Sequence, residues 1–391
     1  MKKKVLVFAG YYFPSVKGGG AIQSLSNLIN ILIDKFDFYV LADDRDLGDE
    51  QHFNNIITDE WIQVGKANVW YTNTKELTFS SLSKIINNLD YDVLYLNSFF
   101  SYNISMIIII LNKLNRISRK PIILAPRGQF TQGALGFKNI KKTVYITIAK
   151  VLGLYRDITW HATSEIEKSD IKAIFGNNVN IKVAKNLTAD YRNFKYDKII
   201  EKNPGELKIV FVSRIHPMKN LMQAIALVRK VIGNVEFNIH GPIEDKSYWA
   251  ECEKVISSLS ANVKVVYKGV IDHDQIISMF KKHHVFLFPT LGENFGHVIS
   301  EALIGGCPVI ISDQTPWRGL KELNVGWDIA LRDEEKFSKI LQHCIDMSKE
   351  EYESLSMSAF EYGRKQSNQE DDIMKTYELF VHDTTVLGGK N

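Results

Sequence analysis

Two glutamates eight positions apart, Glu293 and Glu301, are the residues of this sequence whose spacing most clearly suggests chemistry. The residues between them suit a tight turn, and the apolar run that follows predicts a helix carrying Glu301. A helix N-terminus offers free N–H donors and about half a positive charge, so it attracts phosphate. The two carboxylates would then hold hydroxyl groups beside that phosphate, as a sugar joined to a nucleotide diphosphate requires. The alternative is an ordinary strand–loop–helix unit with surface glutamates.

A second pair of candidates, Arg214 and Lys219, lies in the segment FVSRIHPMKN, just after a predicted strand. Arginine offers a rigid planar fork and lysine a mobile point charge, a combination that suits a diphosphate. Such cations can stabilise the negative charge of a departing nucleotide without a metal ion. The alternative is two exposed bases in a loop.

Three positions in the first half of the chain also follow predicted strands. The run Gly18-Gly19-Gly20 opens the first predicted helix, where glycines let a phosphate or sugar approach the backbone. The alternative is that these glycines only form a flexible loop. Arg127, in APRGQF, is placed to touch the transferred group or an acceptor phosphate. His161 ends the strand in TWHATSE as a further acceptor-side candidate, and Ser164 is a predicted helix N-cap.

Metal chemistry has little support in the sequence. Asp44 and Asp46 form a three-residue DxD pattern, for which we predict no metal site and keep only a role in holding acceptor hydroxyls. His240 and His297 lack metal-ligand spacing, and His297 fits better as a backbone donor in the phosphate turn. The sequence has no GxSxG, HExxH or GxxxxGK[ST] pattern, which argues against serine hydrolases, zincins and P-loop enzymes. We expect neither a metal nor another cofactor.

Composition indicates an ordinary soluble protein large enough for two or three domains, with 391 residues, 45% hydrophobic and 24% charged. The net charge of +3 is small, but residues 93–156 hold ten Lys or Arg side chains and no Asp or Glu. This stretch suggests attraction to an anionic partner, either a membrane surface or a phosphorylated acceptor. Solvated basic faces on several helices are the alternative.

Cellular location is inferred from short apolar runs and scattered cysteines. The start, MKKKVLVFAG, is too short in its apolar part for a signal peptide, and no run approaches the ~20 residues of a membrane span. Cys252, Cys307 and Cys344 predict neither a disulfide framework nor a zinc site. We expect a cytoplasmic protein that touches a membrane, if at all, from its inner face.

Short apolar runs alternate with amphipathic stretches, a pattern that builds parallel sheets covered by helices on both faces. The predicted strands are 5–9, 38–42, 91–96, 121–125, 158–162 and 181–184, and then 207–212, 236–240, 263–268, 285–289 and 308–312. We expect an α/β fold with two doubly wound, Rossmann-like domains, 1–192 and 207–366, facing a central cleft. A polar linker over 193–206 joins them, and a helix in 367–391 packs back on the first domain. Ligands bind such sheets at the carboxyl ends of the strands.

These residues resemble the family 4 glycosyltransferases, retaining enzymes of the GT-B architecture. The resemblance covers essentially the whole chain and is densest at FVSRIHPMKNL, at GENFGHVISEALIGGCPVIISDQTPWR, and at APRG with WHATSE. The SDQTPW segment is similar to members that build bacterial capsules and lipopolysaccharides. The resemblance implies that the first domain serves the acceptor and the second binds the nucleotide sugar.

The resemblance also implies roles for individual residues. Glu301 holds the ribose hydroxyls, Glu293 lies beside the reacting face of the donor sugar, and Arg214 with Lys219 holds the diphosphate. The remaining implied donor contacts are the backbone of Asn294, Phe295, Gly296, His297 and Val298, the Gly18–Gly19 loop, and Gly241 and Val270 near the base. Two positions depart from the family pattern: Arg127 stands where many members carry a histidine, and Lys185-Asn186-Leu187 replaces a common Pro-Asn-Gly.

We therefore expect a retaining hexosyltransferase that moves a sugar from a UDP- or GDP-type donor to a hydroxyl of a saccharide or lipid-linked saccharide, in surface polysaccharide synthesis. We expect no nucleic-acid partner. Two alternatives remain: a nucleotide-sugar epimerase of the same fold, which needs no acceptor, and a non-catalytic sugar-nucleotide-binding subunit, which binds the donor without turnover.

Overall fold

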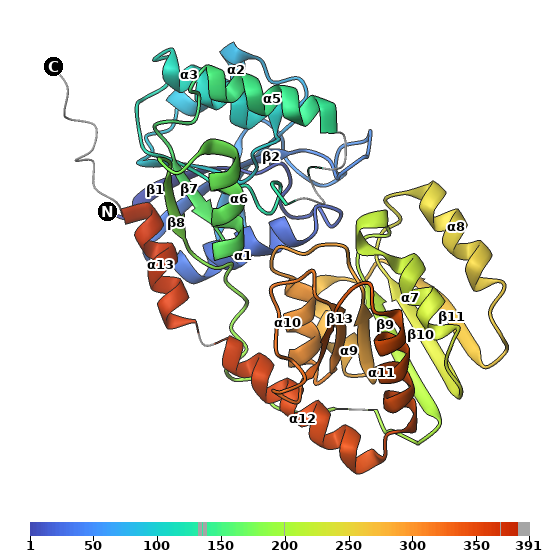
Figure 1. Cartoon of the computed structure of the whole chain (residues 1–391). Helices are drawn as coiled ribbons and strands as arrows, with labels where there is room; N and C mark the ends of the chain where they lie inside the picture. The colour runs from blue at the N-terminus through green and yellow to red at the C-terminus, as the bar shows by residue number, and fades with distance from the viewer. Residues whose placement is uncertain (132–134, 136–138, 199, 368, 382–391) are drawn as a thin grey trace. The chain divides into compact units, whose positions relative to one another are not determined.

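The computed structural model describes residues 1–131, 135, 139–198, 200–367 and 369–381, which fall into two compact α/β units. The first unit comprises 1–187 together with 369–391, and the second comprises 188–368. Each unit is built on a predominantly parallel sheet with helices packed on it, which confirms the predicted fold class (Figure 1). None of the helices in the described ranges combines the length and hydropathy that crossing a bilayer requires.

The sheet of the first unit has eight strands in the order β3-β4-β2-β1-β5-β6-β7-β8, and only the β3–β4 pair is antiparallel. Val5 and Val7 of β1 face one core of this unit, whereas Leu6 and Phe8 face the other, as the two-residue period of a strand requires. The strands are β1 (Lys3–Phe8), β2 (Phe36–Asp43), β3 (Trp61–Val64), β4 (Ala67–Thr72), β5 (Val93–Leu96), β6 (Ile122–Leu124), β7 (Thr159–Ala162) and β8 (Asn180–Val183).

Helices cover this sheet, and one of them comes from the far end of the chain. Phe380 of α13 contacts Phe36 and Tyr95, with both pairs of ring centroids 5.4 Å apart, so α13 packs on the first unit. The helices are α1 (Gly20–Leu32), α2 (Phe79–Asn87), the π-helix η1 (Tyr102–Met106), α3 (Ile107–Lys113), α5 (Asn139–Val151), α6 (Glu165–Phe175) and α13 (Glu370–Val381).

The sheet of the second unit has six parallel strands in the order β11-β10-β9-β12-β13-β14. The strands are β9 (Glu206–Val212), β10 (Asn234–His240), β11 (Val263–Gly269), β12 (Val285–Phe288), β13 (Val309–Ser312) and β14 (Gly326–Ile329). The helices are η2 (Pro217–Lys219), α7 (Leu221–Val228), α8 (Lys246–Ile256), η3 (His273–Gln275), α9 (Ile276–Phe280), α10 (His297–Ile304), α11 (Glu334–Asp346) and α12 (Lys349–Gln366).

Two lysines of the segment 193–206, which we predicted as a linker, are hydrogen-bonded to backbone carbonyls of the second unit. The Lys198 ammonium donates to the carbonyls of Phe280 and His283 at 3.0 and 2.7 Å, and burial lowers the pKa of Lys198 to about 8. The Lys202 ammonium donates to the carbonyls of Ile345 and Met347 at 2.8 and 3.1 Å. The lysines that make this segment polar in sequence thus donate hydrogen bonds to backbone carbonyls of the second unit.

Candidate active site

The carboxyl edge of the second sheet brings two strand-end loops together at Gly241. Gly241 has a φ of 133°, and a Cβ at this position would lie 1.9 Å from the Ser213 carbonyl oxygen, so only glycine fits. The loop after β9 is tied to the loop after β10 because the Ile215 N–H donates to the Pro242 carbonyl at 2.8 Å. This close approach positions Arg214, which lies between the two contacts.

Both predicted phosphate-binding cations are paired with carboxylates. Arg214 Nη1 lies 2.6 Å from Glu244 Oε2, with both side chains about one-third exposed. Lys219 Nζ lies 2.6 Å from Glu293 Oε2, and these side chains are only 14% and 19% exposed. Lys219 Nζ also lies 5.7 Å from the centroid of the Phe288 ring, a cation–π distance. The structure thus joins two residues that the sequence places 74 positions apart.

Backbone contacts fix the lysine end of this pair. Asn220 adopts a left-handed conformation with a φ of 58° directly after η2, and its side-chain amide donates to the Pro289 carbonyl at 2.9 Å. The Leu291 N–H donates to the Met218 carbonyl at 3.0 Å. These bonds attach the loop after β9 to the loop after β12, which carries Glu293.

The glutamate end lies in a turn that opens α10. The Glu293 N–H donates to the Gln314 carbonyl at 2.9 Å, and the Trp317 indole N–H donates to the Phe295 carbonyl at 2.7 Å. Gly296 is the N-cap residue with a φ of 80°, and it brings no side chain to the helix N-terminus. A Cβ at Gly296 would lie 3.1 Å from Glu293 Cγ. The turn is therefore shaped to bring Glu293 to the start of α10, where the helix dipole favours an anion.

Asn294, His297 and Val298 complete this turn, and the His297 ring lies 4.7 Å from that of Phe295, centroid to centroid. Val270, predicted to lie near a nucleotide base, is exposed just after β11.

Glu301 is buried in the second turn of α10. Its Oε1 lies 3.6 Å from Nδ1 of His273, which follows β11 in η3. Burial raises the pKa of Glu301 to about 8 and lowers the pKa of His273. Both pKa shifts favour the uncharged form of the group. At neutral pH the Glu301 carboxyl is therefore protonated in most molecules, and the His273 imidazole is neutral.

In the first unit, Arg127 belongs to a hydrogen-bonded network at the strand ends. It has a positive φ of 56°, and its guanidinium donates to Asn97 at 2.7 Å, to the Tyr95 hydroxyl at 2.8 Å and to Asn186. Asn97 and Asn186 follow β5 and β8, so Arg127 links two strand ends. Asn186, which stands in the unusual Lys-Asn-Leu segment, thus has a structural role that its spacing did not reveal.

His161 is buried, with both ring nitrogens paired. Nε2 lies 2.8 Å from the Ala184 carbonyl and must donate to it, so Nδ1 accepts from the Tyr95 hydroxyl at 2.8 Å. Burial and the nearby Arg127 charge lower the pKa of His161 to about 3. The structure therefore gives His161 a role in positioning Tyr95 and Arg127, and its place as an acceptor-side candidate stays a prediction.

The glycine loop and the acidic pair lie close together in the first unit. Asp46 accepts from Ser15 Oγ at 2.6 Å, from the Val16 N–H at 3.0 Å and from the Leu47 N–H at 2.8 Å, so it holds the segment that leads to Gly18. Gly19 caps α1 with a φ of 63°, and a Cβ at Gly18 would lie 2.6 Å from Ile22 Cδ1.

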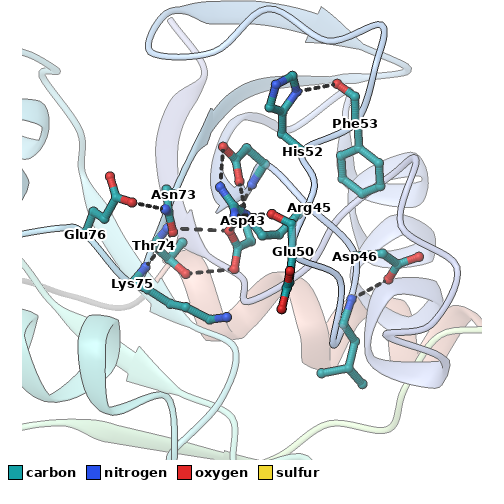
Figure 2. Close-up of polar contacts among 12 residues, drawn as sticks. Asp43, Arg45, Asp46, Glu50, His52, Phe53, Asn73, Thr74, Lys75 and Glu76 are labelled. Atoms are coloured by element: carbon teal, nitrogen blue, oxygen red, sulfur yellow. Dashed lines mark hydrogen bonds and ion pairs between the residues drawn. The ribbon is translucent and has the colours of Figure 1, made fainter.

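The neighbouring acidic residues are also engaged locally. Asp44 accepts from Arg45 Nε at 2.7 Å, and Figure 2 shows Asp43 facing Thr74, whose hydroxyl donates to it at 2.9 Å. The described residues contain no group of three His, Cys, Asp or Glu side chains arranged to hold a metal ion. The DxD carboxylates thus stabilise their own loop, and their predicted contact with acceptor hydroxyls stays a prediction.

The sequence analysis did not identify several residues that hold the candidate site of the second unit in place. Glu244 pairs with Arg214, Asn220 shapes the lysine loop, and Gln314 and Trp317 hold the glutamate turn. Their only signal was position: each follows a strand of the second series, and the carboxyl ends of parallel strands meet at one edge.

The fold of the two units is that of solved glycosyltransferases of GT-B architecture. Residues 193–362 match the family described as "Glycosyl transferases group 1". In the Anabaena protein HepE, whose structure was solved with UDP and glucose, the same fold covers 96% of this chain and 98% of that one, with a TM-score of 0.68 and 17% identity. At that identity the likeness shows the fold alone.

Two relatives are similar in sequence over part of their length. A 41.2 kDa protein in the cps region of Klebsiella pneumoniae is 28% identical over 247 residues, which are 60% of this chain and 65% of that protein. The poly(glycerol-phosphate) alpha-glucosyltransferase of Bacillus subtilis is 30% identical over 166 residues, 41% of this chain and 24% of that enzyme. The chain thus spans less than two thirds of either relative.

Proposed function

We propose that this protein is a metal-independent, retaining glycosyltransferase that moves a hexose from a UDP- or GDP-type donor to a hydroxyl of a saccharide or lipid-linked saccharide. The observation that carries the proposal is the Lys219–Glu293 pair, 2.6 Å apart, with Glu293 in the loop that leads into α10. A cation, a carboxylate and a helix N-terminus at one point are the groups that a sugar diphosphate needs.

The diphosphate is proposed to compete with carboxylates for two cations. On binding, its oxygens replace Glu244 at Arg214 and Glu293 at Lys219, each of which is 2.6 Å from its present partner. Glu293 is then free to accept hydrogen bonds from the donor sugar. Arginine can bind two phosphate oxygens at once, and the lysine ammonium follows the charge as it develops.

Bond breaking is proposed to be helped mainly by support of the leaving group. The bond between the anomeric carbon and the diphosphate oxygen breaks as the acceptor oxygen attacks from the same face, and the acceptor's hydroxyl proton passes to the departing diphosphate oxygen. Negative charge then grows on the nucleotide diphosphate, where Lys219, Arg214 and the amide dipoles of α10 stabilise it. These groups supply the positive charge that a metal ion would otherwise provide.

The acceptor is proposed to be an anionic or lipid-linked saccharide of a surface polysaccharide. Two observations support this: one relative lies in a cps region, and the name of the other specifies a poly(glycerol-phosphate) acceptor. The basic stretch 93–156 would attract such an acceptor.

A donor screen followed by a turnover assay tests the proposal. UDP- and GDP-sugars are screened by thermal shift, since a ligand at 100 times its Kd adds ~2.7 kcal/mol to the free energy of unfolding. The best donor is then incubated with candidate acceptors, and released nucleotide and glycosylated product are measured. The expected product retains the anomeric configuration of the donor.

Each alternative predicts a different result. A new epimer formed from the donor alone would indicate an epimerase, and donor binding without turnover would indicate a non-catalytic subunit. No stabilisation by any nucleotide sugar at millimolar concentration would contradict all three functions.

A further inference from the structure

Helix α5 of the first unit carries a row of exposed aliphatic side chains. Ile140 is 82% exposed, Val144 52%, Ile148 51% and Val151 77%. Spacings of four, four and three residues place these side chains on one face of the helix. Leu152, also exposed, extends the row beyond the end of the helix. We call Ile140, Val144, Ile148 and Val151 the α5 stripe.

The opposite face of α5 already supplies the core contacts. Tyr145 and Ala149 are buried, and the Tyr145 ring lies 5.1 Å from that of Phe99 and 4.9 Å from that of Tyr102. The α5 stripe is therefore not needed to hold the helix on its sheet. Figure 1 shows α5 at the outside of this unit.

Basic side chains flank the stripe. Lys141 and Lys150 are exposed and fall on opposite borders of the stripe on the helical surface. Lys113 lies near the segment that follows the C-terminal end of α5, because its ammonium is 3.1 Å from Oδ2 of Asp157. The sequence from 93 to 156 contains no acidic residue, so Asp157 is the first carboxylate after the stripe.

This combination distinguishes between occupants. A second copy of the same face would bring lysines against lysines, which costs free energy. A free phosphorylated sugar would use the lysines but leave the aliphatic row in water. An anionic bilayer satisfies both parts: aliphatic side chains enter the boundary between headgroups and acyl chains, and lysines extend to the lipid phosphates.

We propose that α5 is a membrane-docking helix, lying in the plane of an anionic lipid surface with the α5 stripe facing the acyl chains. The proposal does not depend on the glycosyltransferase function, since lipid binding needs neither donor nor acceptor. It assigns the basic stretch 93–156 a specific partner surface.

Sedimentation of the full chain with lipid vesicles tests the docking helix. The protein should bind vesicles of phosphatidylcholine mixed with phosphatidylglycerol, and bind phosphatidylcholine alone far more weakly. Replacing the whole stripe, Ile140→Ser, Val144→Ser, Ile148→Ser and Val151→Ser, should weaken binding at least ~100-fold, since each buried aliphatic side chain contributes about tenfold. Lys141→Glu with Lys150→Glu should weaken binding at least ~25-fold, because each base near an anionic surface contributes about fivefold.

Matched controls change similar side chains on other helices. Ile166→Ser replaces an exposed aliphatic residue of α6, and Lys254→Glu reverses an exposed base of α8. Both should bind vesicles like the unchanged protein, and all variants should keep its circular dichroism and melting temperature.

Three results would overturn the proposal. One is no binding to anionic vesicles at low ionic strength. Another is vesicle binding that survives loss of the stripe and depends on charge alone, which would favour a soluble phosphorylated ligand. The third is a dimer in ultracentrifugation that the serine variant abolishes, which would assign the stripe to a second copy.

Discussion

At the scale of single residues, the ion pair between Lys219 and Glu293 is the feature on which the proposed chemistry rests. Each group is mostly buried, so the pair is screened less by salt than a surface pair. Removing one partner leaves the other charge buried and alone. The two residues can therefore be tested separately for stability and for rate.

Lys219→Ala should lower turnover at saturating donor by about 10²–10³-fold, by analogy with loss of one preorganised group that stabilises developing charge. The measurement is nucleotide release with the best donor and acceptor from the screen. The matched control is Lys230→Ala, because Lys230 forms a pair of similar length with Glu334, 2.7 Å, on the surface of the same unit. Near-normal turnover in Lys219→Ala would remove this lysine from the mechanism.

Glu301→Gln should stabilise the ligand-free protein increasingly as pH rises. The pKa of Glu301 is about 8 in the folded protein and near 4.3 in an unfolded chain. Between these two pH values the folded state keeps a proton on Glu301 that the unfolded chain has lost. The contribution of Glu301 to the free energy of unfolding is therefore full below pH ~4 and is lost as pH rises through about 8. Glutamine has no proton to lose and avoids that loss.

The pH effect is measured by urea unfolding of both proteins at several pH values. The difference in free energy of unfolding should be small near pH 4.5 and grow by at most ~1.4 kcal/mol per pH unit up to about pH 8. Glu251→Gln, on the exposed side of α8, is the control. A difference that does not change with pH would show that the Glu301 carboxyl is already ionised in the folded state.

In the second unit, two candidates chosen by residue type and position lie together, since Lys219 pairs with Glu293, and their roles stay predictions. Arg214, Lys219 and Glu293 were identified because charged residues follow strands of one parallel sheet. Arg127 met the same criterion, yet its donors bond Asn97, Asn186 and the Tyr95 hydroxyl. Partners separated by tens of residues are set by tertiary packing, which spacing in a single sequence does not reveal.

At the scale of elements, most of the parallel strands were predicted, whereas β3, β4 and β14 were missed. Buried runs such as Val285–Phe288 are apolar throughout, as a strand covered on both faces requires. The hairpin of β3 and β4 was missed, although Gly65, with a φ of 58°, forms its tight turn. Strand β14 was missed because Gly326–Ile329 is only four residues long and contains Asp328.

Lys202 illustrates how a polar segment becomes part of a core. Its side chain is 2% exposed, and its ammonium donates to three carbonyls, those of Asn203, Ile345 and Met347. Burial lowers its pKa, but the three acceptors offset part of the cost of burying a charge.

Lys202→Met should lower the free energy of unfolding by about 2–4 kcal/mol, because it leaves buried carbonyls without donors. The control, Lys208→Met, changes an exposed lysine six residues further along the same part of the chain and should stay within about 0.5 kcal/mol of the unchanged protein. Urea unfolding gives both values. An equal effect of the two substitutions would mean that 193–206 does behave as a solvated linker.

At the scale of the whole molecule, the chain contributes to the first unit twice. It leaves that unit after residue 187 and returns at residue 369, so residues distant in sequence share one core. Phe380 of α13 packs on Phe36, Phe38 and Tyr95. The second unit has its own core and contains the proposed donor site, so we expect that a substitution in one core leaves the stability of the other unit unchanged.

Phe380→Ala should destabilise the first unit by about 3–5 kcal/mol through the cavity it creates, and leave the second unit unchanged. Phe360→Ala in α12 is the reciprocal variant, because the Phe360 ring is buried in the second unit, 5.6 Å from that of Tyr196. Hydrogen exchange with and without UDP separates the effects: UDP should protect amides of 207–366 in the unchanged protein and in Phe380→Ala alike. Faster exchange throughout both units in Phe380→Ala would mean that the two units unfold as one cooperative body. Protection by UDP only in the first unit would contradict the proposed donor site on the sheet of the second unit.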